Sequence, residues 1–297
     1  MRLQSYRPSP PDAGIALVAV LWGVLLLSVL AVSFGAGAGR EARLARNFLD
    51  NSEARSAAGA GVYWAVGELL KPPEERRVTP NGSTYEIAFA GSRLQVTIQD
   101  EAGKVDLNVA SPALLAGLMS AAGAGPESSR RIAAAVADWR DADSLRHLDG
   151  AERADYEAAG LPRPKDGPFR LVAELRTVFG VGPELYEAVA PFLTVHSGLD
   201  GIDPAVAPAA VLRALPGLDR ANASEIVANR DDADAARATV DGLSAVAGQF
   251  LKQSGGTVHA IRVQAVTQSG ARFTRTAVVQ LLARPDRPYR FLQWNER

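Results

Sequence analysis

The stretch IALVAVLWGVLLLSVLAVSF, residues 15–34, decides how this chain is built. No charged residue occurs between Asp12 and Arg40. As a helix rising 1.5 Å per residue, this uncharged run spans roughly 40 Å, which exceeds the ~30 Å hydrocarbon core of a bilayer. The sequence therefore predicts one membrane anchor followed by a large water-soluble body.

The residues before the apolar run indicate its orientation and leave two ways of processing it. Arg2 and Arg7 precede the run, which favours a cytoplasmic N-terminus and a body on the other side of the membrane. A secretory signal would be cleaved after the run, near residues 36–39. The alternative is cleavage after Gly14, which keeps the span in the mature chain.

Composition excludes several classes of site. The chain has 297 residues, a formal net charge of −1 and no cysteine, so it has no disulfide and no thiolate metal site. Its three histidines, His147, His196 and His259, are too scattered to form a histidine-based zinc site. The near-zero charge gives no general reason to expect nucleic acid or acidic lipid as a partner.

Helical sequence continues beyond the anchor to residue 70, where Lys71-Pro72-Pro73 ends it. The outer half of this long helix is expected to pack on the body through six side chains: Leu44, Phe48, Ala58, Val62, Trp64 and Val66. Alternating apolar residues then predict a hairpin, with strands around residues 85–89 and 94–98 joined by a turn at residues 90–92. Further strands are expected at residues 258–267, 271–282 and 289–293.

Short helices separated by glycine turns fill residues 107–255. Three segments share a helix–glycine turn–helix pattern: residues 107–125, 171–182 and 202–218. Such units resemble helix-hairpin-helix motifs, which hold DNA phosphates with backbone N–H groups. Residues 107–255 carry 14 Lys and Arg against 20 Asp and Glu, however, whereas a DNA-binding lobe should be basic. The glycines are therefore interpreted as packing devices, with a membrane-anchored DNA-binding protein as the alternative function.

Acidic residues gather where one predicted helix ends. Asp138, Asp141 and Asp143 are followed by Glu152 and Asp155, and carboxylate oxygens are the ligands that Ca²⁺ prefers. No EF-hand pattern is present, so a solvated acidic loop remains the alternative. A weaker cluster at residues 231–234 is interpreted as surface. Since no nucleophile, phosphate-loop or dinucleotide motif occurs, the sequence predicts a protein that is not an enzyme.

The combination of these features resembles the type IV pilin-like superfamily, and within it the K-type minor pseudopilins of type II secretion systems. The residues that carry the resemblance are the Gly14–Ile15 junction, the apolar helix, Ala19 where most pilins have glutamate, the segment DEAGKVDLN at residues 100–108, and the motif DWRDAD at residues 138–143. The motif GAE at residues 150–152 and Glu174-Leu175 match as well.

This resemblance implies an α+β fold in which a long N-terminal helix packs on an antiparallel sheet, with a large all-α domain inserted between strands. The implied division has five parts: a prepilin leader at 1–14, a transmembrane half-helix at 15–39, a pilin-like part at 40–106, the inserted helical domain at 107–255, and the closing strands at 256–297.

The resemblance also implies function, partners and location. The chain would be a subunit at the tip of the periplasmic pseudopilus, anchored in the bacterial inner membrane and supporting pseudopilus initiation and protein export. Prepilin peptidase would cleave after Gly14, and Ile15 would become the methylated N-terminus. The implied partners are the I- and J-type minor pseudopilins, the major pseudopilin, the peptidase and the inner-membrane secretion platform, with no nucleic acid.

Some members of this family bind calcium in the insert. By motif, the ligands would be Asp138, Asp141, Asp143 and Glu152, with Asp155 as a substitute ligand. Arg153 stands where an acidic residue often follows the Gly-Ala-Glu motif, which places a cation beside the expected ligands.

Overall fold

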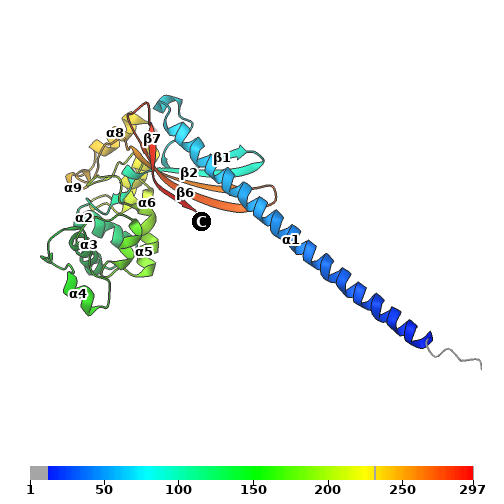
Figure 1. The fold of residues 1–297 in the computed structure, drawn as a ribbon. Coiled ribbons are helices and arrows are strands. Elements are labelled where there is room, and N and C mark those ends of the chain that lie inside the picture. Colours follow the sequence, from blue (N-terminus) through cyan, green and yellow to red (C-terminus); the bar gives the residue numbers. More distant parts are fainter. Residues whose placement is uncertain (1–12, 231, 297) are drawn as a thin grey trace, which may run out of the picture.

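The computed structural model describes residues 13–230 and 232–296, so most of the expected leader lies outside the described residues. Helix α1 (Ala13–Leu69) is 57 residues long and projects far beyond the rest of the molecule (Figure 1). Its segment Ile15–Val32 has a mean hydropathy of 2.9 and no residue buried against the protein. This segment is long and apolar enough to cross a membrane.

Five antiparallel strands form one sheet in the order β1-β2-β5-β6-β7. They are β1 (Asn81–Phe89), β2 (Ser92–Asp100), β5 (Val258–Val266), β6 (Arg272–Leu281) and β7 (Tyr289–Glu296). The predicted hairpin is confirmed, with Ile87 opposite Leu94 and a turn in which Ala90 and Gly91 both have positive φ. The predicted closing strands are confirmed as β5, β6 and β7.

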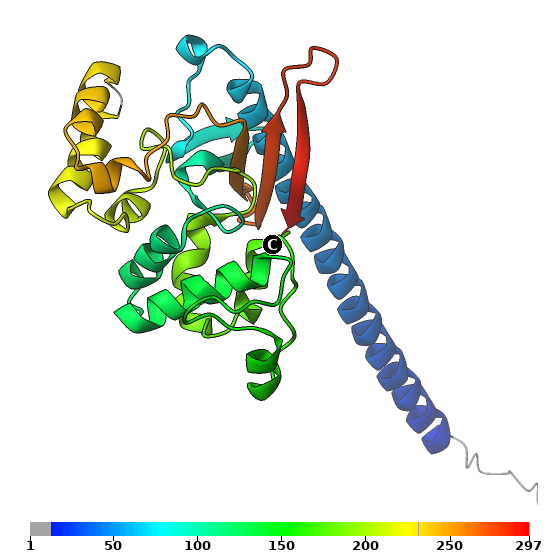
Figure 2. The same cartoon turned by 90° about the vertical axis from the view of Figure 1, so that its left-hand side faces the viewer.

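The C-terminal half of α1 covers one face of this sheet (Figures 1 and 2). Apolar side chains of α1, including Val62 and Val66, pack against β2, β5 and β6. A Cβ on Gly61 would lie only 2.7 Å from Val263 Cγ1, so the glycine lets helix and sheet approach closely.

Two of the six side chains expected to pack on the body do not. Leu44 and Phe48 are 68% and 74% exposed. They lie on the part of α1 that has already left the sheet, since the buried positions of the helix begin at Ala54. A helical pattern shows which side chains share a face but not where the supporting sheet ends.

The lobe between β2 and β5 has its own apolar core, separate from that between α1 and the sheet. Its helices are α2 (Pro112–Ala121), α3 (Pro126–Arg140), α4 (Arg153–Ala158), α5 (Pro183–Val189), α6 (Ala209–Arg213), α7 (Arg220–Asn229), α8 (Ala233–Asp241) and α9 (Ala245–Gly248), with 3₁₀ turns η3 (Val172–Thr177) and η4 (Ala190–Phe192). The expectation of an all-α insert needs one correction. Strand β3 (Val105–Asp106), at the edge of the insert, pairs in parallel with β4 (Leu193–Thr194) inside it.

Two of the three predicted glycine turns of the insert pack against neighbouring side chains, whereas a Cβ on Gly123 or Gly125 in the first turn would meet no atom within 4 Å. Gly180 and Gly217 have positive φ, at 84° and 78°. A Cβ on Gly180 would lie 3.2 Å from Ile132, and one on Gly217 would lie 2.9 Å from Val246. Both glycines therefore provide a backbone conformation and a close approach that larger residues would strain.

Glu68, near the end of α1, forms hydrogen bonds with the segment that leads into β1. Its buried carboxylate accepts hydrogen bonds from Lys71 Nζ at 2.7 Å, Arg77 N at 3.0 Å and Arg77 Nη2 at 2.6 Å. The hydrogen bond from the Arg77 side chain is the largest influence that lowers the pKa of Glu68 to about 2. This contribution to stability is therefore fully present above the ordinary pKa near 4.5 and is lost as the pH falls towards 2.

We expect Glu68→Gln to destabilise the protein at pH 7 by about 1–2 kcal/mol, because charge-assisted hydrogen bonds to a buried group are lost. The difference from the wild type should shrink as the pH falls from 4.5 towards 2. Thermal unfolding of both proteins across this range measures it. Glu74→Gln, on the exposed turn η1 (Pro73–Glu75), is the matched control and should have little effect.

Candidate metal centre

The candidate site forms where α3 ends and the chain turns back towards α4. Trp139 anchors this end of the helix, with ring centroids 5.8 Å from Phe169 and 6.0 Å from Tyr156. Arg140 donates hydrogen bonds to the carbonyl oxygens of Leu107, at 2.7 Å, and Ala110, at 2.9 Å. The last turn of α3 is therefore held on both sides, which fixes the direction of the carboxylate at Asp138.

Asp138 is fully buried and organises the following loop. Its Oδ1 accepts hydrogen bonds from His147 N at 3.0 Å and from His147 Nδ1 at 2.5 Å. Gly150 comes so close that a Cβ there would overlap Asp138 Oδ2, and Asp149 beside it has a φ of 65°. The loop is thus folded around one carboxylate, and position 150 accepts only glycine.

Three carboxylate oxygens at this site are buried and have no hydrogen-bond partner within the described part of the chain: Asp138 Oδ2, Asp141 Oδ1 and Glu152 Oε1. Burial, followed by the charges of Asp143 and Asp138, raises the pKa of Asp141. Burial, followed by the charge of Asp138, also raises the pKa of Glu152. Unpaired acceptors of like charge are costly to bury, and a bound cation removes that cost.

The structure places the five sequence-predicted ligands in different roles. Asp138, Asp141 and Glu152 supply the unpartnered oxygens. Asp143 is exposed, and its Oδ1 accepts a hydrogen bond from Leu145 N at 2.8 Å. Asp155 Oδ2 accepts from Glu152 N at 2.9 Å at the start of α4, and its Oδ1 lies 3.4 Å from Arg146 Nη1. Asp155 therefore holds the start of α4, where its carboxylate already has partners.

Sequence reasoning missed His147. Ligand atoms of Asp138, Asp141 and His147 lie within 4.8 Å of one another, and within the described ranges this is the one such group of three acidic, cysteine or histidine side chains. The hydrogen bond to Asp138 is the largest influence raising the pKa of His147. The sequence signal that could have indicated His147 is a histidine in the loop that follows a helix ending in acidic residues. Arg153, the cation expected beside the ligands, is exposed and makes no ion pair with a described residue.

The donor set suits a hard cation such as Ca²⁺. Ca²⁺ takes six to eight oxygen ligands from carboxylates, carbonyls and water in flexible geometry. Three buried carboxylate oxygens that have no hydrogen-bond partner among the described residues provide the charged part of such a shell. His147 holds the other oxygen of Asp138. The residues present therefore fit calcium.

The architecture is a pilin-like fold: a long N-terminal helix packs on an antiparallel sheet, and the second and third strands of this sheet enclose a helical insert. Comparison with known proteins shows what parts of the chain resemble. Residues 95–198 match the family model described as type II secretion system (T2SS), protein K. This segment runs from β2 to just beyond β4 and contains the candidate metal centre. Over these residues the chain is similar to type II secretion system protein K.

Two relatives are similar to parts of the chain. The type II secretion system protein K of Pectobacterium carotovorum subsp. carotovorum is 27% identical over 145 residues, or 48% of this chain and 44% of that protein. That of Klebsiella pneumoniae is 28% identical over 201 residues, or 61% of each chain. The matches thus span between about two fifths and three fifths of these relatives.

One solved structure shares the fold along most of the chain. The crystal structure of the GspK-GspI-GspJ complex from the enterotoxigenic Escherichia coli type 2 secretion system contains a chain that aligns with a TM-score of 0.62. The alignment covers 85% of this chain and 98% of that chain at 15% sequence identity. At this identity the likeness shows the pilin-like fold alone.

Proposed function

We propose that this protein is a non-enzymatic minor pseudopilin of a type II secretion system, located at the tip of the pseudopilus. The observation that carries the proposal is the continuity of α1. An apolar segment with no residue buried in its own protein runs into a helix half that is packed on a pilin-like sheet. A subunit of this shape buries its apolar helix in the membrane before assembly and against the helices of neighbouring subunits afterwards.

The insert supports a terminal position. It lies to one side of the sheet and widens the end of the molecule away from the apolar half of α1 (Figures 1 and 2). A lobe of this width blocks stacking of a further subunit above it. Ala19 agrees with this, because the glutamate found there in most pilins pairs in low dielectric with the N-terminus of the neighbouring subunit. A subunit with nothing above it does not need this pair.

The proposed topology is single-pass, with a cytoplasmic N-terminus, a periplasmic body and the span in the inner membrane. Prepilin peptidase would cut after Gly14 and leave Ile15 as the methylated N-terminus. The proposed partners are the I- and J-type minor pseudopilins, the major pseudopilin and the inner-membrane platform. The structural neighbour supports the first two, because it was solved in a complex with GspI and GspJ.

Mass spectrometry of the mature N-terminus tests the processing step. We expect a methylated Ile15 in cells that contain the peptidase. An N-terminus near residues 36–39 would show that the apolar segment is a cleaved signal, and would contradict the proposal. The role in export is tested by deleting the gene in its own host, where secretion should stop and return with the intact gene.

We also propose that the carboxylates between α3 and α4 bind calcium, because three of their buried oxygens have no hydrogen-bond partner among the residues that the structure describes. Calcium at 100 times its dissociation constant should stabilise the folded protein by about 2.7 kcal/mol. The measurement is thermal unfolding of the full chain in detergent, with millimolar calcium or with a chelator.

Asp138→Asn should abolish the calcium-dependent shift, because it removes the charge at the centre of the cluster. Glu157→Gln is the matched control, since Glu157 lies nearby on α4 with an exposed side chain, and it should keep the shift. Wild-type protein that melts at the same temperature with and without calcium would show that the loop is stable without a cation.

A further inference from the structure

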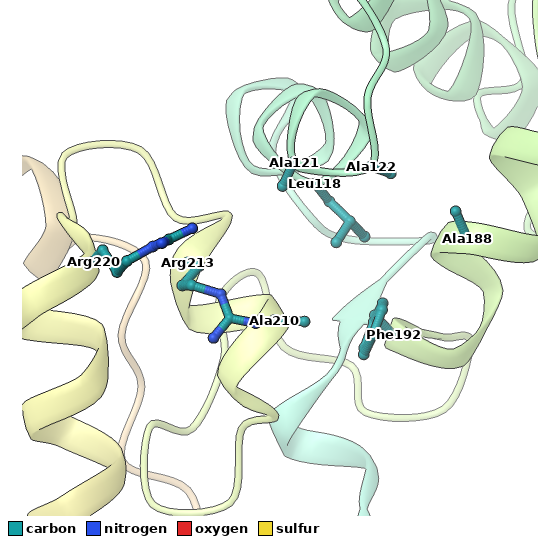
Figure 3. A pocket seen from close by; sticks show the side chains of 8 residues that line it. All are labelled: Leu118, Ala121, Ala122, Ala188, Phe192, Ala210, Arg213 and Arg220. Atoms are coloured by element: carbon teal, nitrogen blue, oxygen red, sulfur yellow. The ribbon is translucent and has the colours of Figure 1, made fainter.

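A pocket of about 490 Å³ opens in the insert between α2 and α6, away from the carboxylate cluster. Its two sides differ in chemistry (Figure 3). One side is apolar, with Leu118 and Ala121 from α2 and Ala122 just after it, together with Ala188 and Phe192. The other side carries Arg213 from α6 and Arg220 from the first turn of α7.

These two arginines have no counter-ion among the described residues. Neither guanidinium forms a hydrogen bond or ion pair with any residue among 13–230 and 232–296. The surrounding lobe has a net charge of −6, so the missing partner does not reflect a shortage of acidic side chains. Asp219, next to Arg220, instead accepts a hydrogen bond from Asn222 N at 2.8 Å and caps α7. Two guanidinium groups on one pocket favour a carboxylate ligand.

A second pocket, of about 510 Å³, adjoins the first at Phe192, which lines both. It lies on the face of the sheet opposite α1, where Thr97, Arg262 and Thr276 alternate with the buried residues of β2, β5 and β6. Arg262 also lacks an ion pair with a described residue. Beside apolar residues such as Pro191 and Pro208, amide side chains also line it, including Asn81, Gln293 and Asn295. Such groups suit the N–H and C=O groups of an extended polypeptide.

We propose that the two pockets form one docking groove for an extended acidic segment of another protein. A carboxylate of this segment lies between Arg213 and Arg220, a neighbouring apolar side chain packs on Leu118 and Phe192, and the backbone continues towards Arg262. Free phosphate is a poorer fit, because one whole side of the first pocket is apolar. Nucleic acid is a poorer fit than a short segment, because its row of phosphates would extend over an acidic lobe, whereas one carboxylate lies between the two arginines. The proposal does not depend on the role in secretion.

Fluorescence anisotropy with labelled peptides tests the groove, using the full-length chain in detergent micelles at low salt. The probe alternates aspartate with leucine, and the comparison peptides replace aspartate with asparagine or lysine. We expect the aspartate peptide to bind and its affinity to fall as salt is added. The double variant Arg213→Glu/Arg220→Glu should weaken binding by about a hundredfold, since each lost charge-assisted contact costs about a factor of ten.

Arg284→Glu/Arg287→Glu is the matched control, because it makes the same change of charge on the exposed loop between β6 and β7. This variant should bind as the wild type does. The proposal is overturned if the aspartate peptide does not bind, if the asparagine peptide binds equally well, or if both double variants lose affinity equally. Displacement of the peptide by a short DNA duplex would overturn it in favour of a nucleic-acid site.

Discussion

Replacing Gly103 with alanine is expected to lower the melting temperature of the full-length chain by about 5–10 °C, since overpacking costs about 1–3 kcal/mol. Gly103 ends η2 (Glu101–Gly103), the turn that leads from β2 into the insert. A Cβ there would lie 2.5 Å from the carbonyl oxygen of Val206 and 2.8 Å from the Cα of Ala207. These are backbone atoms, so no side-chain rotation relieves the contact.

The contact lies where the insert meets the sheet. Asp203 N donates to the carbonyl oxygen of Ala102 at 2.8 Å, and Gln99 Nε2 donates to that of Val206 at 2.8 Å. A shift of the segment around Val206 therefore disturbs both hydrogen bonds. We expect the variant to lose protection from hydrogen exchange first at residues 99–103 and 203–207.

Gly67→Ala is the matched control for this prediction. Gly67 lies on the exposed side of α1, and a Cβ there meets no atom within 4 Å. Alanine in a helix interior is expected to stabilise the protein by about 0.5–1 kcal/mol. If Gly103→Ala melts at the same temperature as Gly67→Ala, the close contact between η2 and Val206 is not a feature of the folded protein.

The second large effect concerns Asp100 and His259, which face each other at the same junction. Both are buried, with Asp100 Oδ2 lying 3.7 Å from His259 Nδ1. Burial raises the pKa of Asp100 to about 7. A hydrogen bond from Ala102 N opposes this rise, and the negative charges of Asp203 and Glu101 add to it. Burial, together with the charge of Arg76, lowers the pKa of His259 to about 4.

The two shifts have opposite consequences for stability. Between pH 4 and 7 the folded protein holds a proton on Asp100 that the unfolded chain releases, so this contribution to stability falls as the pH rises. Between pH 6.5 and 4 the folded protein excludes a proton from His259 that the unfolded chain binds, so this contribution is lost as the pH falls. In the wild type the two effects largely cancel.

In the Asp100→Asn variant, the contribution of His259 to the pH dependence of stability should therefore no longer be cancelled. Relative to the wild type, this variant is expected to lose about 3 kcal/mol of stability as the pH falls from 7 to 4. His259→Gln should show the opposite trend and gain stability over the same range. Denaturant unfolding of both variants and of the double variant measures these slopes. If the free energy of unfolding changes with pH in the same way for the wild type, both single variants and the double variant, neither group titrates as its burial requires.

Hydropathy and period-two alternation predicted the parts of the fold in which local sequence decides the structure. The uncharged run before Arg40 predicted α1, and the alternation around Leu94 predicted the first hairpin, because both patterns follow directly from backbone geometry. The small parallel pair β3 and β4 left no comparable signal. Each strand has two residues, and the partners lie far apart in the sequence.

The candidate metal centre was predictable by residue type but not by geometry. The motif from Asp138 to Asp143 and the motif ending in Glu152 indicated the acidic cluster. Which oxygens remain without a partner depends on the loop conformation, which brings His147 to Asp138 and assigns Asp155 to the start of α4. Sequence spacing does not encode these contacts, because they depend on one tight turn around Asp149 and Gly150.

The proposed function requires the exposed length of α1 to pack against other pseudopilins. Because Phe48 is 74% exposed on the part of α1 beyond the sheet, a photoreactive phenylalanine analogue at this position tests the packing inside secreting cells. We expect crosslinked adducts in which mass spectrometry finds the N-terminal helix of another pseudopilin, whereas the same analogue at Arg284 should give none. Membrane-inserted protein that forms no adduct with a pseudopilin at Phe48 would contradict the proposed function.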